Sequence, residues 1–161
     1  MKTPSSSMQL TRAADYGVRV MIELASLEGS GRVSLPELAR ATSAPQSFLS
    51  KVLQSLARAG FITSQRGQSG GFHITPRGAA ASMGAVIEAI DGSILLNVCL
   101  SPGRSCSRKA RCPAHPVWAL AQRSMMEVLS SVNITGLATQ SAARRQSVDR
   151  ALRSSAQSTC R

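Results

Sequence analysis

The chain has 161 residues, enough for one ordinary hydrophobic core, and its apolar fraction of 43% is compatible with a packed domain. Its formal charge of +11, from 19 Lys and Arg against 8 Asp and Glu, favours polyanionic partners, of which nucleic acid is the commonest in the cytosol. No apolar run is long enough to span a membrane, and residues 1–7 lack the apolar core of a secretory signal, so we expect a cytoplasmic protein without a membrane partner.

Two helices are predicted at the start of the chain. Residues 8–27 place apolar side chains at three- and four-residue steps, and Thr11 is a suitable N-cap. Ser34 and Glu37 form a capping-box pattern, which predicts a short second helix over residues 35–41. Residues 1–7, before the first helix, are expected to be a disordered leader.

A third helix is predicted from a start signal at Ser43 to residue 59, with Gly60 ending it in a left-handed conformation. The second and third helices would form a helix-turn-helix. The expected buried side of the third helix consists of Phe48, Leu49, Val52, Leu53 and Leu56. Its polar side consists of Gln46, Ser47, Ser50, Lys51 and Gln54, which can reach base edges or phosphates in a DNA groove. A solvated helix face would show the same polarity.

Two strand-like runs follow this helix-turn-helix. Residues 61–63 and 71–74 flank a polar, glycine-rich tip that carries Arg66, Gly67 and Gly70. A hairpin in this position is a wing, whose arginine can approach the DNA backbone or a narrow minor groove. The predicted fold is therefore mainly α with a small β-hairpin wing. It comprises a winged helix-turn-helix domain over residues 8–92 and a long C-terminal dimerisation helix.

The dimerisation helix is predicted over residues 117–138, after a cysteine-rich loop at 93–116. Apolar residues recur along it at three- and four-residue steps, a pattern suited to pairing with a second copy. They are Trp118, Ala121, Met125, Val128 and Val132. Residues 139–161 are rich in Ser, Arg, Ala and Gln with a net charge of +4, so we expect a basic disordered tail in which Cys160 is an incidental thiol.

The cysteine-rich loop offers four soft ligands within seventeen residues: Cys99, Cys106, Cys112 and His115. Thiolate and imidazole select zinc, copper or iron-sulfur clusters over magnesium and calcium. Structural zinc sites usually contain short CxxC pairs, which are absent here, so the spacing favours an iron-sulfur cluster while leaving zinc open. Three unrelated reduced cysteines are the remaining interpretation.

In their order along the chain, these features resemble the Rrf-two family of winged-helix transcriptional regulators, which includes the iron-sulfur regulators IscR and NsrR. The resemblance covers about residues 8–138. It rests on Met8-Gln-Leu-Thr11, on the wing Arg66-Gly-Gln-Ser-Gly-Gly71, on Ala89-Ile-Asp91 and on three cysteines before a long helix. It implies a homodimer that binds a palindromic double-stranded DNA operator, usually as a repressor.

The resemblance also implies that Cys99, Cys106 and Cys112 ligate the cluster. Cys112-Pro-Ala-His115 is similar to the IscR pattern, in which the histidine completes a 2Fe-2S site, and this is the favoured assignment. The sequence around Asp15 is instead similar to the NsrR pattern, in which an aspartate from the partner subunit completes a 4Fe-4S site. This chain departs from the pattern by one extra residue between the first two cysteines and by Ser50, where IscR has a glutamate that discriminates between operators.

These observations predict a cluster-dependent transcriptional regulator that senses cluster status, nitric oxide or redox and iron state. The alternative is a zinc-stabilised or metal-free winged-helix regulator without cluster sensing. We do not expect an enzyme or a small-molecule substrate, because no nucleotide-binding glycine motif, haem-attachment motif or catalytic constellation occurs in the sequence.

Overall fold

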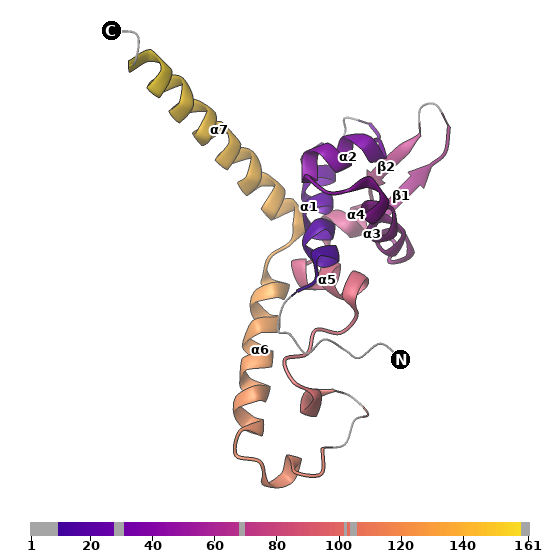
Figure 1. The fold of residues 1–161 in the computed structure, drawn as a ribbon, viewed down its shortest axis with the longest axis vertical. Helices are drawn as coiled ribbons and strands as arrows, with labels where there is room; N and C mark the ends of the chain where they lie inside the picture. Colours follow the sequence, from indigo (N-terminus) through magenta and orange to yellow (C-terminus); the bar gives the residue numbers. More distant parts are fainter. Residues whose placement is uncertain (1–9, 28–30, 68–69, 102, 104–105, 159–161) are drawn as a thin grey trace.

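The computed structural model describes residues 10–27, 31–67, 70–101, 103 and 106–158. Figure 1 shows a compact lobe of short helices with a β-hairpin, and a long helix, α6, that leads away from it to the cysteine loop. This confirms the predicted mainly α fold with a two-stranded wing. The elements in chain order are α1 (Arg12–Ser26), α2 (Leu35–Thr42), α3 (Gln46–Arg58), β1 (Ile62–Gln65), β2 (Gly71–Ile74), α4 (Pro76–Ala80), α5 (Met83–Asp91), α6 (His115–Ser131) and α7 (Ile134–Ser158), with short 3-10 turns at Val98–Leu100 and Lys109–Arg111.

The lobe has one core, in which α1 is the central helix. Met21 and Val20 on α1 are fully buried, as are Leu38 of α2 and Leu49 of α3. Neighbours from α5 and from the first turn of α7 complete the same cluster. The helices of the lobe are amphipathic, so burial of their apolar stripes is the main force that holds them together.

The predicted helix starts are largely confirmed. The Thr11 hydroxyl accepts from the Ala14 amide at 3.2 Å, and Ser34 and Glu37 form a capping box in which the Glu37 carboxylate accepts from the Ser34 amide at 2.8 Å. The Ser34 hydroxyl, and then its amide, lower the pKa of the Glu37 carboxyl group. The prediction that Ser43 starts the third helix is wrong. Ser43 ends α2 in a left-handed conformation with φ 54°, and α3 begins after Pro45 without a side-chain cap.

The wing is an antiparallel hairpin in which Ile62 pairs with Ile74 and Gln65 with Gly71. Val33, just before α2, forms a further bridge to Phe72, with its amide 3.0 Å from the Phe72 carbonyl oxygen. The hairpin is thereby attached to the helix-turn-helix through backbone hydrogen bonds.

The predicted single helix over residues 117–138 is two helices. Helix α6 ends at Ser131, and Val132 is extended with φ −111° and ψ 120°. The Val132 carbonyl oxygen accepts from the Met83 amide at 2.9 Å, and the Ile134 amide donates to Ala81 at 3.0 Å. We call this segment, residues 132–134 paired with residues 81–83, the elbow. Pairing with the lobe takes the backbone out of the helical conformation there, so the apolar seam predicted to continue to Val132 stops one turn earlier.

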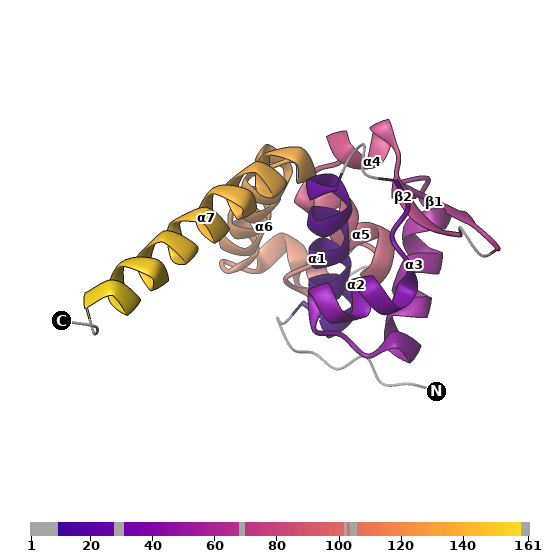
Figure 2. The same ribbon diagram turned by 90° about the horizontal axis from the view of Figure 1, so that it is seen from above.

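The expectation of a disordered tail over residues 139–161 also differs from the structure. Helix α7 continues to Ser158, and its first half lies along α1 (Figure 2). Ala138 is buried there, and the Arg145 guanidinium lies 3.3 Å from the Glu23 carboxylate. Low hydrophobicity suggested disorder, but alanine and arginine are good helix formers and α1 supplies a docking face. The leader at residues 1–7 and Cys160 lie outside the described residues.

The packing of α4 against β1 leads to a prediction about Gly78. Alanine is normally about 1 kcal/mol better than glycine within a helix. At Gly78, however, an added Cβ would overlap the Phe61 backbone carbonyl oxygen. We therefore expect Gly78→Ala to destabilise the fold by about 1–3 kcal/mol, the usual cost of overpacking, measured by urea unfolding.

The control for this substitution is Ala80→Ser in the same helix, where the side chain is exposed. The control should leave the unfolding midpoint unchanged. A Gly78→Ala variant as stable as the original chain would contradict the packing described for α4.

Candidate functional site

Helix α3 presents the predicted polar face at the surface of the lobe. Gln46, Ser47, Lys51 and Gln54 are exposed, and Ser50 is half-buried with its hydroxyl donating to the Gln46 carbonyl oxygen at 3.1 Å. On the opposite side, Leu49, Val52, Leu53 and Leu56 are buried as predicted. The polar residues of α3 are therefore available to a partner.

The prediction that Phe48 belongs to the buried side of α3 is wrong. Its side chain is 39% exposed, and its ring meets the ring of Tyr16 edge-on with 5.6 Å between centroids. The guanidinium of Arg19 lies 5.8 Å from the other ring of this pair, that of Tyr16. This aromatic contact fixes the start of α3 against α1.

The wing lies on the same side of the lobe as α3. Figure 2 shows the hairpin beside α3, with α7 on the opposite side of the molecule. Arg66 and Gly67 are exposed, and Gly67 has φ 115°, a conformation that favours glycine. Gly70 is half-buried and its amide donates to the Gly67 carbonyl oxygen at 2.9 Å, which tightens the tip. Helix α3 and the hairpin thus lie on one side of the molecule (Figure 2).

Asp15 lies on the exposed side of α1 and is paired within its own helix. Its carboxylate is 2.7 Å from the Arg19 guanidinium, and both side chains are 51% exposed. Arg19 also donates to the Thr42 carbonyl oxygen at 3.5 Å, in the last turn of α2. Asp15 is therefore held close to the helix-turn-helix by Arg19.

A series of tight turns connects three of the candidate metal ligands. The Lys109 amide donates to the Cys106 carbonyl oxygen at 2.9 Å, and the Cys112 amide lies 3.5 Å from the Lys109 carbonyl oxygen. The His115 amide donates in turn to the Cys112 carbonyl oxygen at 3.2 Å, where α6 begins. Cys99 is on a separate 3-10 turn that contacts α6. A backbone hydrogen bond therefore joins Cys112 directly to His115.

The donor groups match a soft metal in chemistry but do not converge on one point. The Nδ1 atom of His115 is buried and has no hydrogen-bond partner within the described part of the chain, which leaves it available to a ligand. Among the residues that the structure describes, however, no three Cys, His, Asp or Glu side chains are close enough to hold one ion. Ligation therefore requires the loop to draw the cysteines together around His115.

The sequence analysis missed Gln122, which connects α6 to the start of the loop. Its side-chain oxygen accepts from the Leu96 amide at 2.8 Å, and its side-chain nitrogen donates to the Ile94 carbonyl oxygen at 2.7 Å. We call this pair of bonds the Gln122 clamp. A lone glutamine on a helix carries no recognisable signal in a single sequence, because its partners are backbone atoms 26 and 28 residues away.

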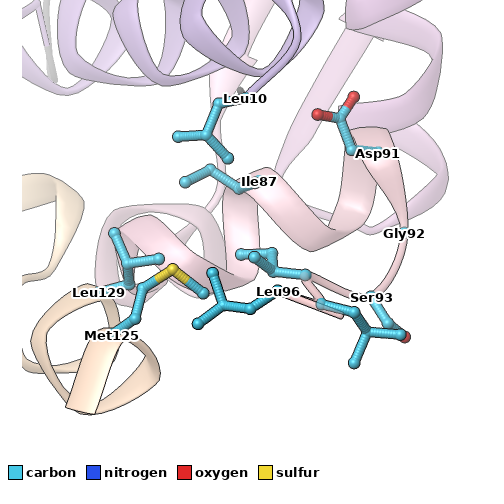
Figure 3. Close-up of a pocket in the computed structure, with 10 residues that line it drawn as sticks. Leu10, Ile87, Asp91, Gly92, Ser93, Leu96, Met125 and Leu129 are labelled. Atoms are coloured by element: carbon cyan, nitrogen blue, oxygen red, sulfur yellow. The ribbon is translucent and has the colours of Figure 1, made fainter. Parts of the chain in front are cut away.

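Beside the Gln122 clamp lies a cavity of about 390 Å³ between α5, α6 and the loop. Figure 3 shows Met125 and Leu129 of α6 facing Leu96, with Leu10 and Ile87 on the other side. Asp91 at its edge accepts from the Thr11 hydroxyl at 2.6 Å, which ties the end of α5 to the start of α1. We call α6 together with the cysteine loop the arm. This cavity lies where the arm meets the lobe.

The exposed apolar face of α6 differs in part from the predicted seam. Ala121 and Val128 are exposed as a partner surface requires, but Trp118 and Met125 are half-buried, and Met125 lines the cavity. Val117, Leu120 and Val128 are 66%, 59% and 65% exposed. Within the part of the chain that the structure describes, none of the helices has the length and apolar character required to cross a membrane.

Comparisons with known proteins agree with this architecture. The model of the Rrf2 family, described as "Iron-dependent Transcriptional regulator", matches residues 10–140. The HTH-type transcriptional regulator NsrR of Geobacillus kaustophilus is 28% identical over 131 residues, 81% of this chain and 89% of that protein. The HTH-type transcriptional regulator IscR of Vibrio cholerae is 28% identical over 127 residues, covering 79% and 73%. The solved structure of CymR, the global cysteine regulator of B. subtilis, superposes with a TM-score of 0.67 at 26% identity, covering 82% and 97%.

Proposed function

Because this chain belongs to the Rrf2 family of transcriptional regulators, we propose that it is a homodimeric repressor whose operator affinity depends on an iron-sulfur cluster. The ligands would be Cys99, Cys106, Cys112 and His115. The observation that carries this proposal is the buried Nδ1 atom of His115, which has no hydrogen-bond partner among the described residues, on a residue whose amide donates to the Cys112 carbonyl oxygen. The cysteines would hold a cluster as thiolates, and the cluster would supply iron and sulfide that oxidants and nitric oxide can attack.

His115 is a better candidate than Asp15 for the fourth ligand. The Asp15 carboxylate is neutralised by Arg19 at 2.7 Å, so recruiting it would break an existing ion pair. Among the residues that the structure describes, His115 has no hydrogen bond at Nδ1 that ligation would break, and its amide donates to the Cys112 carbonyl oxygen. The His115 assignment favours a 2Fe-2S cluster, whereas Asp15 from the partner subunit would favour 4Fe-4S.

DNA recognition would use one side of the lobe. Helix α3 would enter the major groove with Gln46, Ser47, Ser50, Lys51 and Gln54, and Arg66, Gly67 and Gly70 of the wing would lie against the backbone. In a dimer paired through α6, ordering of the loop would set the distance between the two copies of α3. The free energy of metal binding would thereby order the cysteine loop and α6. This ordering would bias the distance between the two recognition helices, and with it the spacing of the DNA half-sites that they fit.

A second candidate is a zinc-stabilised or metal-free regulator that binds DNA without sensing a cluster. One observation favours the metal-free form of this candidate, because the four donors do not converge on a single point in the part of the chain that the structure describes. It shares the DNA-binding surface and the dimer, and differs only in what the cysteine loop does.

The cluster assignment is tested by purifying the protein anaerobically and measuring its visible absorption, circular dichroism, iron, sulfide and zinc. We expect a coloured protein with matched iron and sulfide, and loss of the colour in Cys112→Ser. His115→Ala should alter or lose the spectrum, whereas Asp15→Ala should leave it unchanged. The opposite pattern in the last two variants would establish the Asp15 model, and a colourless protein that resists reconstitution would leave the second candidate.

The DNA interface is tested by the salt dependence of binding. We expect Lys51→Ala and Arg66→Ala each to weaken binding to all sequences and to lower the slope of log K against log salt by about 1, as loss of one phosphate contact predicts. Arg123→Ala removes the same charge from an exposed position on α6 and serves as the control. Equal effects of all three substitutions would mean that DNA affinity depends only on the net charge of the protein, and would reject the proposed DNA-binding face.

The dimer surface is tested by Leu120→Asp, which places a carboxylate in the exposed apolar face of α6. If this face is buried against a second copy, the uncompensated charge should raise the dimer dissociation constant about a hundredfold or more. Analytical ultracentrifugation measures this constant directly. Ala41→Asp, on the exposed side of α2, should leave the dimer intact, and an undiminished dimer in Leu120→Asp would place the interface elsewhere.

A further inference from the structure

We propose that Gln122 is a positioning residue for the metal site, since its amide closes the loop that carries all four candidate ligands. This inference rests on the proposed function. The Gln122 clamp joins α6 to Ile94 and Leu96, immediately before Cys99, while His115 begins the same helix. Cys99, near the start of the loop, and His115, at its end, are thereby both connected to α6.

The geometry of the Gln122 clamp makes it specific. One amide side chain donates at 2.7 Å and accepts at 2.8 Å, and its two partners are backbone groups of Ile94 and Leu96, two residues apart. Because the side chain donates to one of these residues and accepts from the other, it fixes both the position and the direction of the backbone over residues 94–96. A hydrophobic side chain of equal size could pack in the same place without fixing either.

The position along α6 explains why this contact matters for ligation. The elbow anchors the C-terminal end of α6 to the lobe, and Met125 and Leu129 line the cavity. The Gln122 clamp lies seven residues from His115, about two helical turns, on the side of the loop. Without it, the stretch leading to Cys99 would lose its hydrogen bonds to the helix that bears His115.

Loop closure gives the size of the effect. Holding the ends of a long loop together before metal binds removes part of the entropic cost of ligation. Two hydrogen bonds of ordinary net strength correspond to roughly a tenfold or greater change in an equilibrium constant. We therefore expect Gln122 to strengthen metal retention by about this factor, without any contact to the metal.

The test uses the full-length protein with two substitutions. Gln122→Met keeps the volume and removes both hydrogen bonds, whereas Gln122→Glu keeps the acceptor for the Leu96 amide and loses the donor to Ile94. Ser124→Ala, at an exposed neighbouring position of α6, is the matched control. Each protein is reconstituted anaerobically with iron and sulfide, or loaded separately with Zn²⁺ alone, and release to a chelator is followed. Amide exchange at Leu96, the unfolding temperature and DNA affinity of the metal-free protein are measured in parallel.

We expect Gln122→Met to release metal about tenfold faster and to lose protection at Leu96. Gln122→Glu should keep that protection but retain metal less well than the original chain. Unfolding temperature and metal-free DNA affinity should stay unchanged, which a general structural defect would not allow. Unchanged release in Gln122→Met, unchanged Leu96 exchange, or a parallel loss of global stability would each overturn the inference. If the original chain takes up neither cluster nor zinc, metal binding itself fails, and the proposed sensing function falls with this inference.

Discussion

The attachment of α6 to the lobe at the elbow is the constraint on which the rest of the structure depends. Two backbone hydrogen bonds join Met83 to Val132 and Ile134 to Ala81, and the Ile134 side chain is fully buried in the lobe. Every residue of α6 is described, and none of its side chains is fully buried. Its direction is therefore set by the elbow, the cavity and the Gln122 clamp rather than by a core of its own. These contacts hold α6 from Gln122 to the elbow, and its first turns, beginning at His115, are the part of the helix farthest from the lobe (Figure 1).

This arrangement separates two physical roles along one chain. The lobe is stabilised by ordinary burial around α1, with Val20, Met21, Leu38 and Leu49 all fully excluded from solvent. The arm instead exposes Val117, Leu120 and Val128, whose burial requires a second surface. In the described residues of the cysteine loop, the regular structure consists of two short 3-10 turns, and Arg108, Lys109 and Arg111 are exposed. Under the proposed function, DNA recognition would belong to the lobe, association to the apolar side of α6 and sensing to the loop.

The sequence predicts those features that depend on local chemistry. The cap at Thr11, the capping box at Ser34 and the glycine-rich wing follow from side chains that satisfy nearby backbone groups, and each is present. Features that depend on backbone groups far away in the sequence cannot be predicted in this way. The break at Val132 exists because residues 81–83 pair with it, and the apolar period alone gave no sign of that pairing. Similarly, Phe48 fits the helical stripe but is drawn to Tyr16 on α1. The pattern of ligand types is readable in the sequence, whereas the Gln122 clamp that would position them is tertiary.

The few contacts that hold α6 also set the energy scale on which the proposed cluster sensing would operate. Allosteric coupling in proteins typically amounts to 1–3 kcal/mol, and a single net hydrogen bond contributes about 1 kcal/mol. The elbow and the Gln122 clamp together contain four such bonds, so the preference of the arm for one direction is of the same order as the coupling required. The free energy of binding a structural metal is far larger than this coupling, about 10–16 kcal/mol for zinc-finger sites. A small fraction of such a binding free energy would therefore be enough to change the direction of α6. A more extensively buried α6 would resist such a signal. An arm without the elbow would have no defined direction to change, and the distance between two recognition helices would then carry no information about the loop.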